Sequence, residues 1–261
     1  MRSPAPRFAR GFTLAELAIS FAIIALLLAS FMFTYSAQID QRNFQENRSR
    51  IEAARELLLS YAIVNGRLPC PAAPNTTGDE SPAAGGNCTN PLNGYLPAKT
   101  IGYQQVDSSG YAMDAYGNRI FYAVASTLTG CAGSSTLPHF TNATNLKANG
   151  ITCQPNDLVV CKSSTGITGS SCNSTANAVT NQSIVVAIVF SGGKNFATAP
   201  NSASAIAAGR NDEAANLNGD PVFVFHTPAP SGATNGEFDD YLAWITVGEL
   251  YGRLISAGVL P

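Results

Sequence analysis

A long apolar run near the N-terminus constrains this chain more than any other feature. Residues 12–33 (FTLAELAISFAIIALLLASFMF) contain one charged side chain, that of Glu16. At about 1.5 Å per residue, a helix of this length is about 33 Å long and matches a hydrocarbon layer of about 30 Å. Residues 1–11 carry three arginines and no acidic residue. The positive-inside rule therefore predicts a membrane-spanning helix with a cytoplasmic N-terminus and the remaining chain outside.

A cleaved secretory signal peptide and a plain signal anchor are the alternatives. A signal peptide has an apolar core of about 7–15 residues followed by a small-residue cleavage site. Here the apolar run continues through Phe33, past the weak candidate site at Ala29-Ser30. A plain anchor explains the length but not Glu16, because a carboxylate inside a membrane helix costs about 2.5–3.5 kcal/mol on insertion scales. We therefore expect Glu16 to have a charged partner.

The start of the apolar run resembles the prepilin signature of type IV pilins and type II secretion pseudopilins. Residues 11–14 (GFTL), followed by Glu16, carry this resemblance. In that family a prepilin peptidase cuts after the glycine, and the new N-terminal phenylalanine is N-methylated. The resemblance implies a leader peptide at 1–11, cleavage after Gly11 and N-methylation of Phe12. It also implies that Glu16 neutralises the terminal amine of a neighbouring subunit, since a pair of opposite charges is tolerated where each alone is costly.

The apolar run passes into a stretch without proline or glycine that extends to Gly66. Its apolar residues recur mostly at three- and four-residue steps, and polar residues fill the other positions. This pattern predicts an amphipathic continuation, so that one helix covers 12–64, ends at Gly66 and cannot resume at Pro69. A separate coiled-coil stalk is the alternative, although the repeat is short for heptads. The resemblance implies that the second half of the helix packs on a sheet.

Residues 65–261 are expected to form a periplasmic or extracellular globular head. Runs of β-branched and aromatic residues between turn residues predict strands, of which the third is central: Arg119–Ala125, Leu158–Cys161, Ser183–Phe190 and Pro221–His226. Residues 240–257 are predicted to be helical, with Asp239 or Asp240 as N-cap and Gly258 as C-cap. The stretches 72–94 and 127–182 are predicted to be surface loops. The expected fold class is α+β, a type IV pilin-like long helix on an antiparallel sheet with disulfide-tied loops.

All six cysteines lie in the predicted head, in a region rich in Asn, Ser and Gly. No two of them form a C-x-x-C pair, and an even number in such a region predicts disulfides in an oxidising compartment. Six cysteines allow 15 connectivities. Proximity in sequence favours three pairs without proving them: Cys70–Cys88, Cys131–Cys153 and Cys161–Cys172.

Two segments of the head also resemble the major pseudopilin of type II secretion. Residues 114–122 fit its D-x-W-G-N-x-x-x-Y element, with Tyr116 as the aromatic residue. Residues 237–244 are similar to the acidic segment near its calcium loop. The second similarity implies Ca²⁺ as a cofactor, with Asp239 and Asp240 as ligands. Helix capping and surface charge are the favoured alternative for this pair.

Little in the sequence indicates catalysis or nucleic-acid binding. The two histidines, His139 and His226, lie in different contexts, and both are expected to be structural or exposed. Ser191-Gly-Gly-Lys194 matches S-x-x-K without the companion motifs of serine acyl-transferases. The net charge of −2 provides no electrostatic basis for binding nucleic acid.

The sequence therefore predicts a structural subunit of a pilus or secretion filament, and not an enzyme. The size of the head favours a minor pilin or pseudopilin. Its expected partners are other pilin or pseudopilin subunits, the prepilin peptidase, the inner-membrane assembly platform and membrane lipid. It is expected first in the bacterial inner membrane and then in the filament. A filament-displayed adhesin that binds through 127–182 and a membrane-anchored hydrolase are the alternatives.

Overall fold

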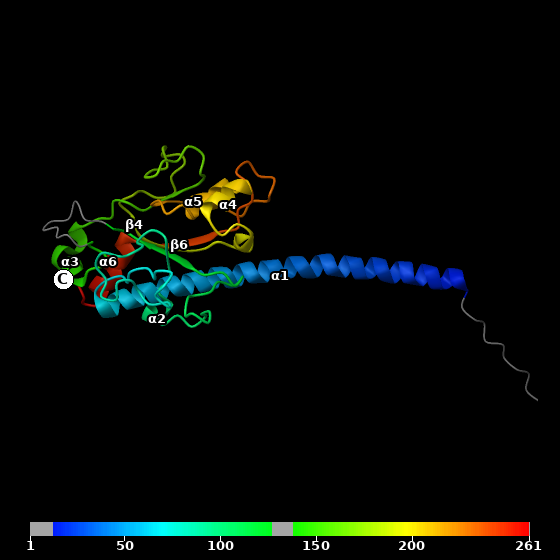
Figure 1. Cartoon of the computed structure of the whole chain (residues 1–261), viewed down its shortest axis with the longest axis horizontal. Coiled ribbons are helices and arrows are strands. Elements are labelled where there is room, and N and C mark those ends of the chain that lie inside the picture. Colours follow the sequence, from blue (N-terminus) through cyan, green and yellow to red (C-terminus); the bar gives the residue numbers. More distant parts are fainter. Residues whose placement is uncertain (1–12, 127–137, 261) are drawn as a thin grey trace, which may run out of the picture. The chain divides into compact units, whose positions relative to one another are not determined.

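The structure is a computed structural model that describes residues 13–126 and 138–260, with the backbone alone described at 30–37. The chain divides into two compact units, Met1–Gln45 and Glu46–Pro261 (Figure 1). Helix α1 (Leu14–Asn65) begins in the first unit and ends in the second, and it corresponds to the helix predicted over 12–64.

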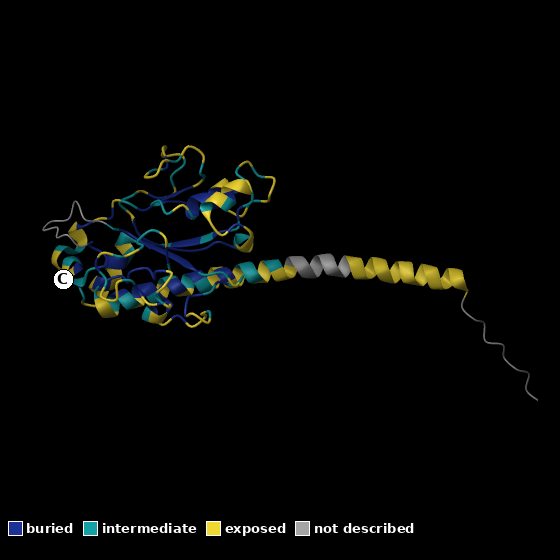
Figure 2. Ribbon diagram, in the orientation of Figure 1, coloured by how far each residue is buried: buried dark blue, intermediate teal, exposed yellow. Residues whose placement is uncertain are grey.

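Apolar side chains are exposed along the part of α1 that lies in the first unit. Every side chain described from residue 13 to residue 29 is exposed, as Figure 2 shows in yellow. The exposed fraction reaches 89% at Leu14 and 73% at Leu26. Over the described residues, no helix satisfies the length and hydropathy required of a membrane span.

The second unit contains two sheets. The larger has four antiparallel strands in the order β1-β2-β4-β6: β1 (Gly94–Tyr95), β2 (Phe121–Val124), β4 (Val185–Ser191) and β6 (Tyr241–Thr246). Strand β4 is interior and buried along its whole length, as the continuous apolar run predicted. The smaller sheet pairs β3 (Val159–Cys161) with β5 (Val222–Val224) in parallel. The sequence did not predict this second sheet.

The C-terminal part of α1 packs within the same hydrophobic core as the larger sheet. Ile51, Ala54 and Leu58 are fully buried in that core, at the three- and four-residue steps of one helix face. The helix ends where the sequence predicted. Gly66 has a φ of +67°, and its N–H donates to the carbonyl of Ala62 at 2.8 Å.

Short helices fill the connections between the strands. Only the last was predicted in part: α2 (Ala98–Ile101), α3 (Ala143–Asn149), η1 (Gly150–Thr152), η2 (Phe196–Thr198), α4 (Ser202–Ala207), α5 (Asn211–Asn216) and α6 (Val247–Ser256). The prediction that 72–94 and 127–182 are surface loops is therefore only partly right. Ala72 and Glu80 are buried, and α3 lies inside the second stretch.

The predicted helix over 240–257 is wrong in its first part, because residues 241–246 form β6. Leu242 and Ile245 have helical spacing, yet both are buried in the core as strand residues beside β4. Helix α6 begins only after Thr246, whose side chain accepts a hydrogen bond from the N–H of Glu249. Thr246, and neither Asp239 nor Asp240, is therefore the N-cap. The C-cap is Ala257, one residue before Gly258.

Two of the predicted disulfides are confirmed. Cys70 is bonded to Cys88, and Cys161 is bonded to Cys172. The third predicted pair includes Cys131, which lies outside the described residues.

Candidate functional site

The N-terminal end of α1 holds Glu16 in a capping box with Thr13. The backbone N–H and the hydroxyl of Thr13 donate to Glu16 Oε2 at 2.9 and 2.8 Å, and the N–H of Glu16 faces Thr13 Oγ1 at 3.3 Å. Glu16 is exposed. The predicted processing residues Gly11 and Phe12 lie outside the described residues. The capping box, which starts at Thr13 directly after Phe12, therefore fixes the only carboxylate of the apolar run in the first turn of the helix.

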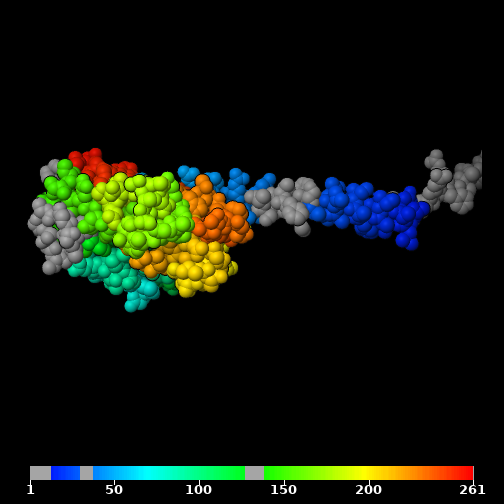
Figure 3. Space-filling model, turned by 90° about the horizontal axis from the view of Figure 1, so that it is seen from above, coloured from blue at the N-terminus to red at the C-terminus, as the bar shows by residue number. Residues whose placement is uncertain are grey.

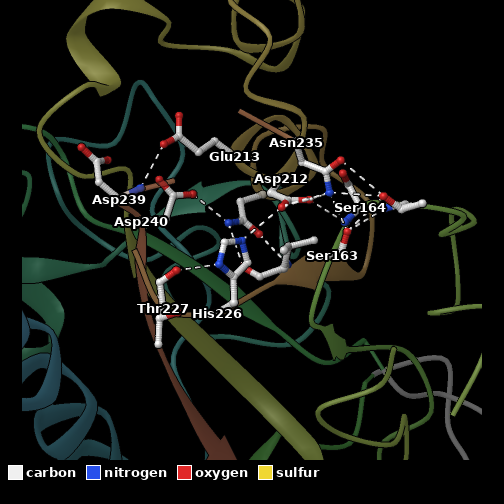
Figure 4. A network of polar contacts seen from close by, with 12 residues as sticks. Ser163, Ser164, Asp212, Glu213, His226, Thr227, Asn235, Asp239 and Asp240 are labelled. Carbon is white, nitrogen blue, oxygen red and sulfur yellow. Dashed lines mark hydrogen bonds and ion pairs between the residues drawn. The ribbon is translucent and has the colours of Figure 1, made fainter. Parts of the chain in front are cut away.

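A second group of carboxylates lies in the head. Glu213 of α5 and the consecutive Asp239 and Asp240, which precede β6, place carboxylate oxygens within 4.8 Å of one another (Figure 4). Glu213 and Asp240 are buried, and Asp239 is partly buried. The structure thus brings the two predicted calcium ligands together with a third carboxylate from a distant part of the sequence. We call these three residues the acidic cluster.

Hydrogen bonds hold the acidic cluster between α5 and the turn after β4. Glu213 Oε1 accepts from Asn195 Nδ2 at 2.8 Å and from the N–H of Asp239 at 3.1 Å. Asp239 Oδ2 accepts from the N–H of Asn195 at 3.2 Å, and Asp240 Oδ2 accepts from Asn216 Nδ2 at 2.7 Å. Asn195 therefore contacts two of the three carboxylates, through its backbone and its side chain.

The turn after β4 closes on Asp239 because residue 193 is glycine. Gly193 has a φ of +68°, and a Cβ atom there would lie 1.8 Å from Asp239 Oδ1. A side chain at this position would be both strained and in collision with the carboxylate. Glycine at position 193 thus permits the close approach of this turn to Asp239.

Burial and mutual repulsion disfavour the charged forms of these acids. Burial raises the pKa of Asp239 to about 7, with the neighbouring Glu213 as the next cause. Burial, followed by Glu213, also raises the pKa of Asp240 well above its ordinary value. Burial raises the pKa of Glu213 as well, although Asn195, Asp239 and Arg210 counteract it. Arg210 forms an ion pair with one member of the cluster, because its Nη1 lies 3.3 Å from Glu213 Oε2.

Two oxygens at the acidic cluster lack hydrogen-bond partners. Asn195 Oδ1 and Asp239 Oδ1 are buried and accept no hydrogen bond from the described residues. A buried polar atom without a partner is costly. Ca²⁺ binds six to eight oxygen ligands, several of them usually carboxylates. Glu213, Asp239, Asp240 and Asn195 are therefore the residues that could hold such a cation. The sequence identified the aspartates, whereas only tertiary structure could bring Glu213 and Asn195 to them.

Beside the acidic cluster, Asp212 forms a separate polar network (Figure 4). Its Oδ1 accepts from the N–H of Ser164 at 2.6 Å, and its Oδ2 lies 3.1 Å from His226 Nε2. The other ring nitrogen of His226 lies 2.7 Å from the carbonyl oxygen of Thr227. Ser163 Oγ accepts from Asn235 Nδ2. Serine, histidine and aspartate therefore gather here, but the two ring nitrogens of His226 contact the carbonyl oxygen of Thr227 and the carboxylate of Asp212, and not a serine hydroxyl.

The S-x-x-K serine has a structural environment. Ser191 is fully buried, and its hydroxyl donates to Asp114 Oδ2 at 2.6 Å. It accepts from Asn47 Nδ2 at 3.0 Å and from the N–H of Gly193 at 3.1 Å. Asp114 Oδ1 in turn accepts from two backbone N–H groups, those of residues 116 and 118, and so stabilises the turn that they form. Ser191 thus joins α1 to this turn.

Comparison with known proteins bears on the N-terminal site. Residues 6–32 match the family model of the prokaryotic N-terminal methylation motif. No curated protein and no solved structure matched the chain. The matched range includes Gly11, Phe12, the Thr13–Glu16 capping box and the exposed apolar part of α1. Residues 6–32 of the chain therefore carry the prokaryotic N-terminal methylation motif, which is the type IV prepilin-like signal motif.

Proposed function

We propose that the protein is a structural subunit, a minor pilin or pseudopilin, of a type IV pilus or type II secretion filament. The observation that carries this proposal is the match of residues 6–32 to the N-terminal methylation motif. In this proposal a prepilin peptidase removes residues 1–11, and Phe12 becomes the methylated N-terminus. Residues 65–261 form the exported head, and its size favours a minor over a major subunit.

In this proposal the apolar surface of α1 lies first in the membrane and then against neighbouring subunits of the filament. Apolar side chains exposed to water are unfavourable in proportion to their area. Those of residues 13–29 are exposed within their own unit, so another apolar phase has to cover them. We propose that residues 12–33 lie in the inner membrane, with the N-terminus in the cytoplasm and the head in the periplasm. After the assembly platform extracts the subunit, neighbouring subunits replace the lipid.

In this proposal the charge of Glu16 determines where the subunit docks in the filament. Its carboxylate lies at the first turn of α1, where a neighbouring subunit's terminal amine can neutralise it. Glu16→Gln tests the charge alone, because the glutamine carbonyl can still accept from Thr13. We expect the variant to be processed normally but to be lost from sheared filaments. Glu46→Gln, which changes an exposed acid of the same helix, is the matched control and should assemble. Wild-type incorporation of Glu16→Gln would refute the role of this charge.

We also propose that the acidic cluster binds Ca²⁺. The observation in favour is the pair of buried, unpartnered oxygens on Asn195 and Asp239 beside three close carboxylates. Calorimetric titration of the full chain in detergent should show one calcium site. Glu213→Gln should abolish it, whereas Asp79→Asn, at an exposed carboxylate outside the cluster, should leave it unchanged. A wild-type chain that binds no calcium would refute the site.

A displayed binding module remains the second candidate function. A cavity of about 520 Å³ lies in the region predicted as the binding surface. Its lining residues are all uncharged and come mostly from 171–184, next to the Cys161–Cys172 disulfide. Such a site would suit a neutral polar ligand. Exchanging 171–184 for an unrelated loop should abolish adhesion and preserve assembly, and unchanged adhesion would refute this candidate.

A further inference from the structure

A groove in the second unit collects aromatic and charged side chains between a helix and the edge of the larger sheet. Its volume is about 440 Å³, which is within the range of small-molecule sites. It lies between α1 and β6, the last strand in the order of that sheet. Residues 225–240, which connect β5 to β6, form part of the surface of this unit, in orange in Figure 3. Six lining residues are aromatic or charged: Arg48, Glu52, Arg55, Phe225, Tyr241 and Trp244. We call this site the aromatic groove.

Three aromatic rings in the groove hold one another in place. The ring of Phe225 stands nearly perpendicular to those of Tyr241 and Trp244, at interplanar angles of 87° and 76°. The ring centres are 5.9 and 5.8 Å apart, which is the range of favourable edge-to-face contacts. All three residues are only partly buried. The groove therefore presents ordered aromatic surface to solvent.

The charged side chains of the groove come from α1 and carry both signs. Arg55 Nη2 donates to both carboxylate oxygens of Glu249, at 2.5 Å. Glu52 accepts from the hydroxyl of Tyr241 at 3.1 Å, and the guanidinium of Arg48 lies 5.9 Å from the centre of the Tyr241 ring. Arg48 is exposed and forms no ion pair with the residues that the structure describes. Hydrogen-bond donors and a carboxylate acceptor thus lie one helical turn apart beside the rings.

This combination disfavours a charged ligand, an apolar ligand and an added strand. A ligand carboxylate would meet the like charge of Glu52, and a ligand cation would meet that of Arg48. A purely apolar ring would remove water from both groups without replacing its hydrogen bonds. An extended peptide added to β6 would need the backbone at the sheet edge, where the carbonyl of Trp244 already accepts from Arg55 Nε at 2.9 Å.

An uncharged sugar ring satisfies all of these conditions. Its hydroxyls both donate and accept hydrogen bonds, and its C–H face can pack on an aromatic ring. We infer that the aromatic groove binds a neutral saccharide, with one sugar ring against Trp244 and its hydroxyls bonded to Arg48 and Glu52. This site is separate from the cavity near 171–184, because the two share no lining residue. It also does not depend on the filament-subunit proposal, which is tested at the N-terminus.

Fluorescence of Trp244 reports on the groove directly, because the chain has no other tryptophan. The full chain, in a detergent without a sugar headgroup, is titrated with maltose, cellobiose and lactose. At least one of these disaccharides should shift the tryptophan emission and reach saturation. The acidic disaccharide digalacturonate should bind more weakly than that one. A chain that responds to none of the three, or that binds digalacturonate more tightly than all of them, would overturn the inference.

Arg48→Gln tests the donors that α1 supplies. The variant should bind the preferred disaccharide about tenfold more weakly or worse, because hydrogen bonds from a charged donor are the stronger ones. Arg48 is exposed, so the head should remain folded. Arg42→Gln, at an exposed arginine of the same helix outside the lining, is the matched control and should bind as the wild type does. The exchange of 171–184 should also leave the emission response unchanged. Unaltered affinity in Arg48→Gln would contradict the assigned site.

Glu52→Gln tests why the ligand is uncharged. The variant removes the negative charge and keeps an oxygen that accepts from Tyr241. Digalacturonate should bind more tightly to Glu52→Gln than to the wild type, since the repulsion of its carboxylates is gone. The affinity for the neutral disaccharide should change less. If the ratio of the two affinities stays at the wild-type value, Glu52 does not set the preference for a neutral saccharide, and that part of the inference fails.

Discussion

Arg67 and Glu80 form a buried ion pair that connects the end of α1 to the loop after it. The guanidinium donates to both carboxylate oxygens, at 2.8 and 2.7 Å. Glu80 also accepts from the N–H of Cys70 and from the hydroxyl of Tyr61. The interaction with Glu80 raises the pKa of Arg67 and favours its charged form. The Glu80 side chain thus accepts hydrogen bonds from three residues between 61 and 70.

Glu80→Ala should destabilise the head strongly. The change leaves the charge of Arg67 buried without a partner, for which we expect a loss of about 3–5 kcal/mol in the free energy of unfolding. Chemical denaturation of the full chain measures it. Asp79→Ala is the matched control, because the side chain of Asp79, the residue before Glu80, is 55% exposed and its carboxylate lies 4.0 Å from Lys99 Nζ. The control should change stability by less than about 1 kcal/mol. Equal effects of the two substitutions would contradict the assigned role of Glu80.

His139 is a buried histidine that favours the neutral state. The hydroxyl of Tyr251 donates its hydrogen to the carbonyl of Cys153, so His139 Nε2 must donate to that hydroxyl, at 3.0 Å. The other ring nitrogen, Nδ1, is buried and has no partner among the described residues. Burial lowers the pKa of His139 to about 4.

His139 should therefore contribute a loss of stability as the pH is lowered from about 6.5 towards 4, whereas Asp239, Asp240 and Glu213, whose pKa values burial raises, contribute in the opposite direction. Over this window the unfolded chain takes up a proton at residue 139 while the folded chain does not, so proton binding stabilises the unfolded state relative to the folded one. One such group changes the free energy of unfolding by at most about 1.4 kcal/mol per pH unit. His139→Gln keeps a side chain that can donate to Tyr251 and should remove this loss, so that stability falls less, or rises more, across the same pH window than in the wild type. An unchanged pH profile in His139→Gln would show that other groups cause it.

At the scale of elements, the sequence predicted the parts with strong periodic patterns. The continuous pattern of α1, the apolar run of β4 and the Gly66 terminus all agree with the structure. The boundary between β6 and α6 was missed because the residues of β6 are buried or partly buried on both faces and are almost all apolar, so the strand lacks the usual polar–apolar alternation. The apolar spacing of Leu242 and Ile245 then resembled a helix.

The missed elements and ligands have no local pattern long enough to identify them. Helices α4 and α5 have six residues each and consist mostly of small and polar residues. The parallel pairing of β3 with β5 depends on tertiary contacts that neither strand encodes alone. Glu213 accepts a hydrogen bond from the N–H of Asp239, but the two residues are 26 positions apart in the sequence, so no local motif could connect them. The sequence thus identified two of the three residues of the acidic cluster and not its geometry.

The Cys70–Cys88 disulfide ties the loop after α1 across a sequence separation of 18 residues. Replacing both cysteines by alanine should lower the free energy of unfolding by about 3 kcal/mol, because a closed loop of this size restricts the unfolded chain. Thermal or chemical unfolding under oxidising conditions measures the loss. The Cys161–Cys172 pair, with a separation of 11, provides a comparison of similar expected size. Wild-type stability of the Cys70→Ala/Cys88→Ala variant would contradict the expected role of this bridge.

At the scale of the whole molecule, the two units carry different chemistry. The first presents an apolar helix surface with Glu16 at its beginning, and the second is a packed head with buried polar contacts. The matched motif lies entirely in the first unit. The match therefore characterises a short N-terminal segment of the chain, and it carries no information about the head.

The most direct test of the central claim is intact mass and N-terminal sequencing of the membrane-extracted protein, produced with and without a prepilin peptidase. The account predicts a chain that begins at N-methylated Phe12 when the peptidase is present and at Met1 when it is absent. A chain that still begins at Met1 in the presence of an active peptidase would contradict the account. It would make the protein a plain signal-anchored protein and remove the role assigned to Glu16.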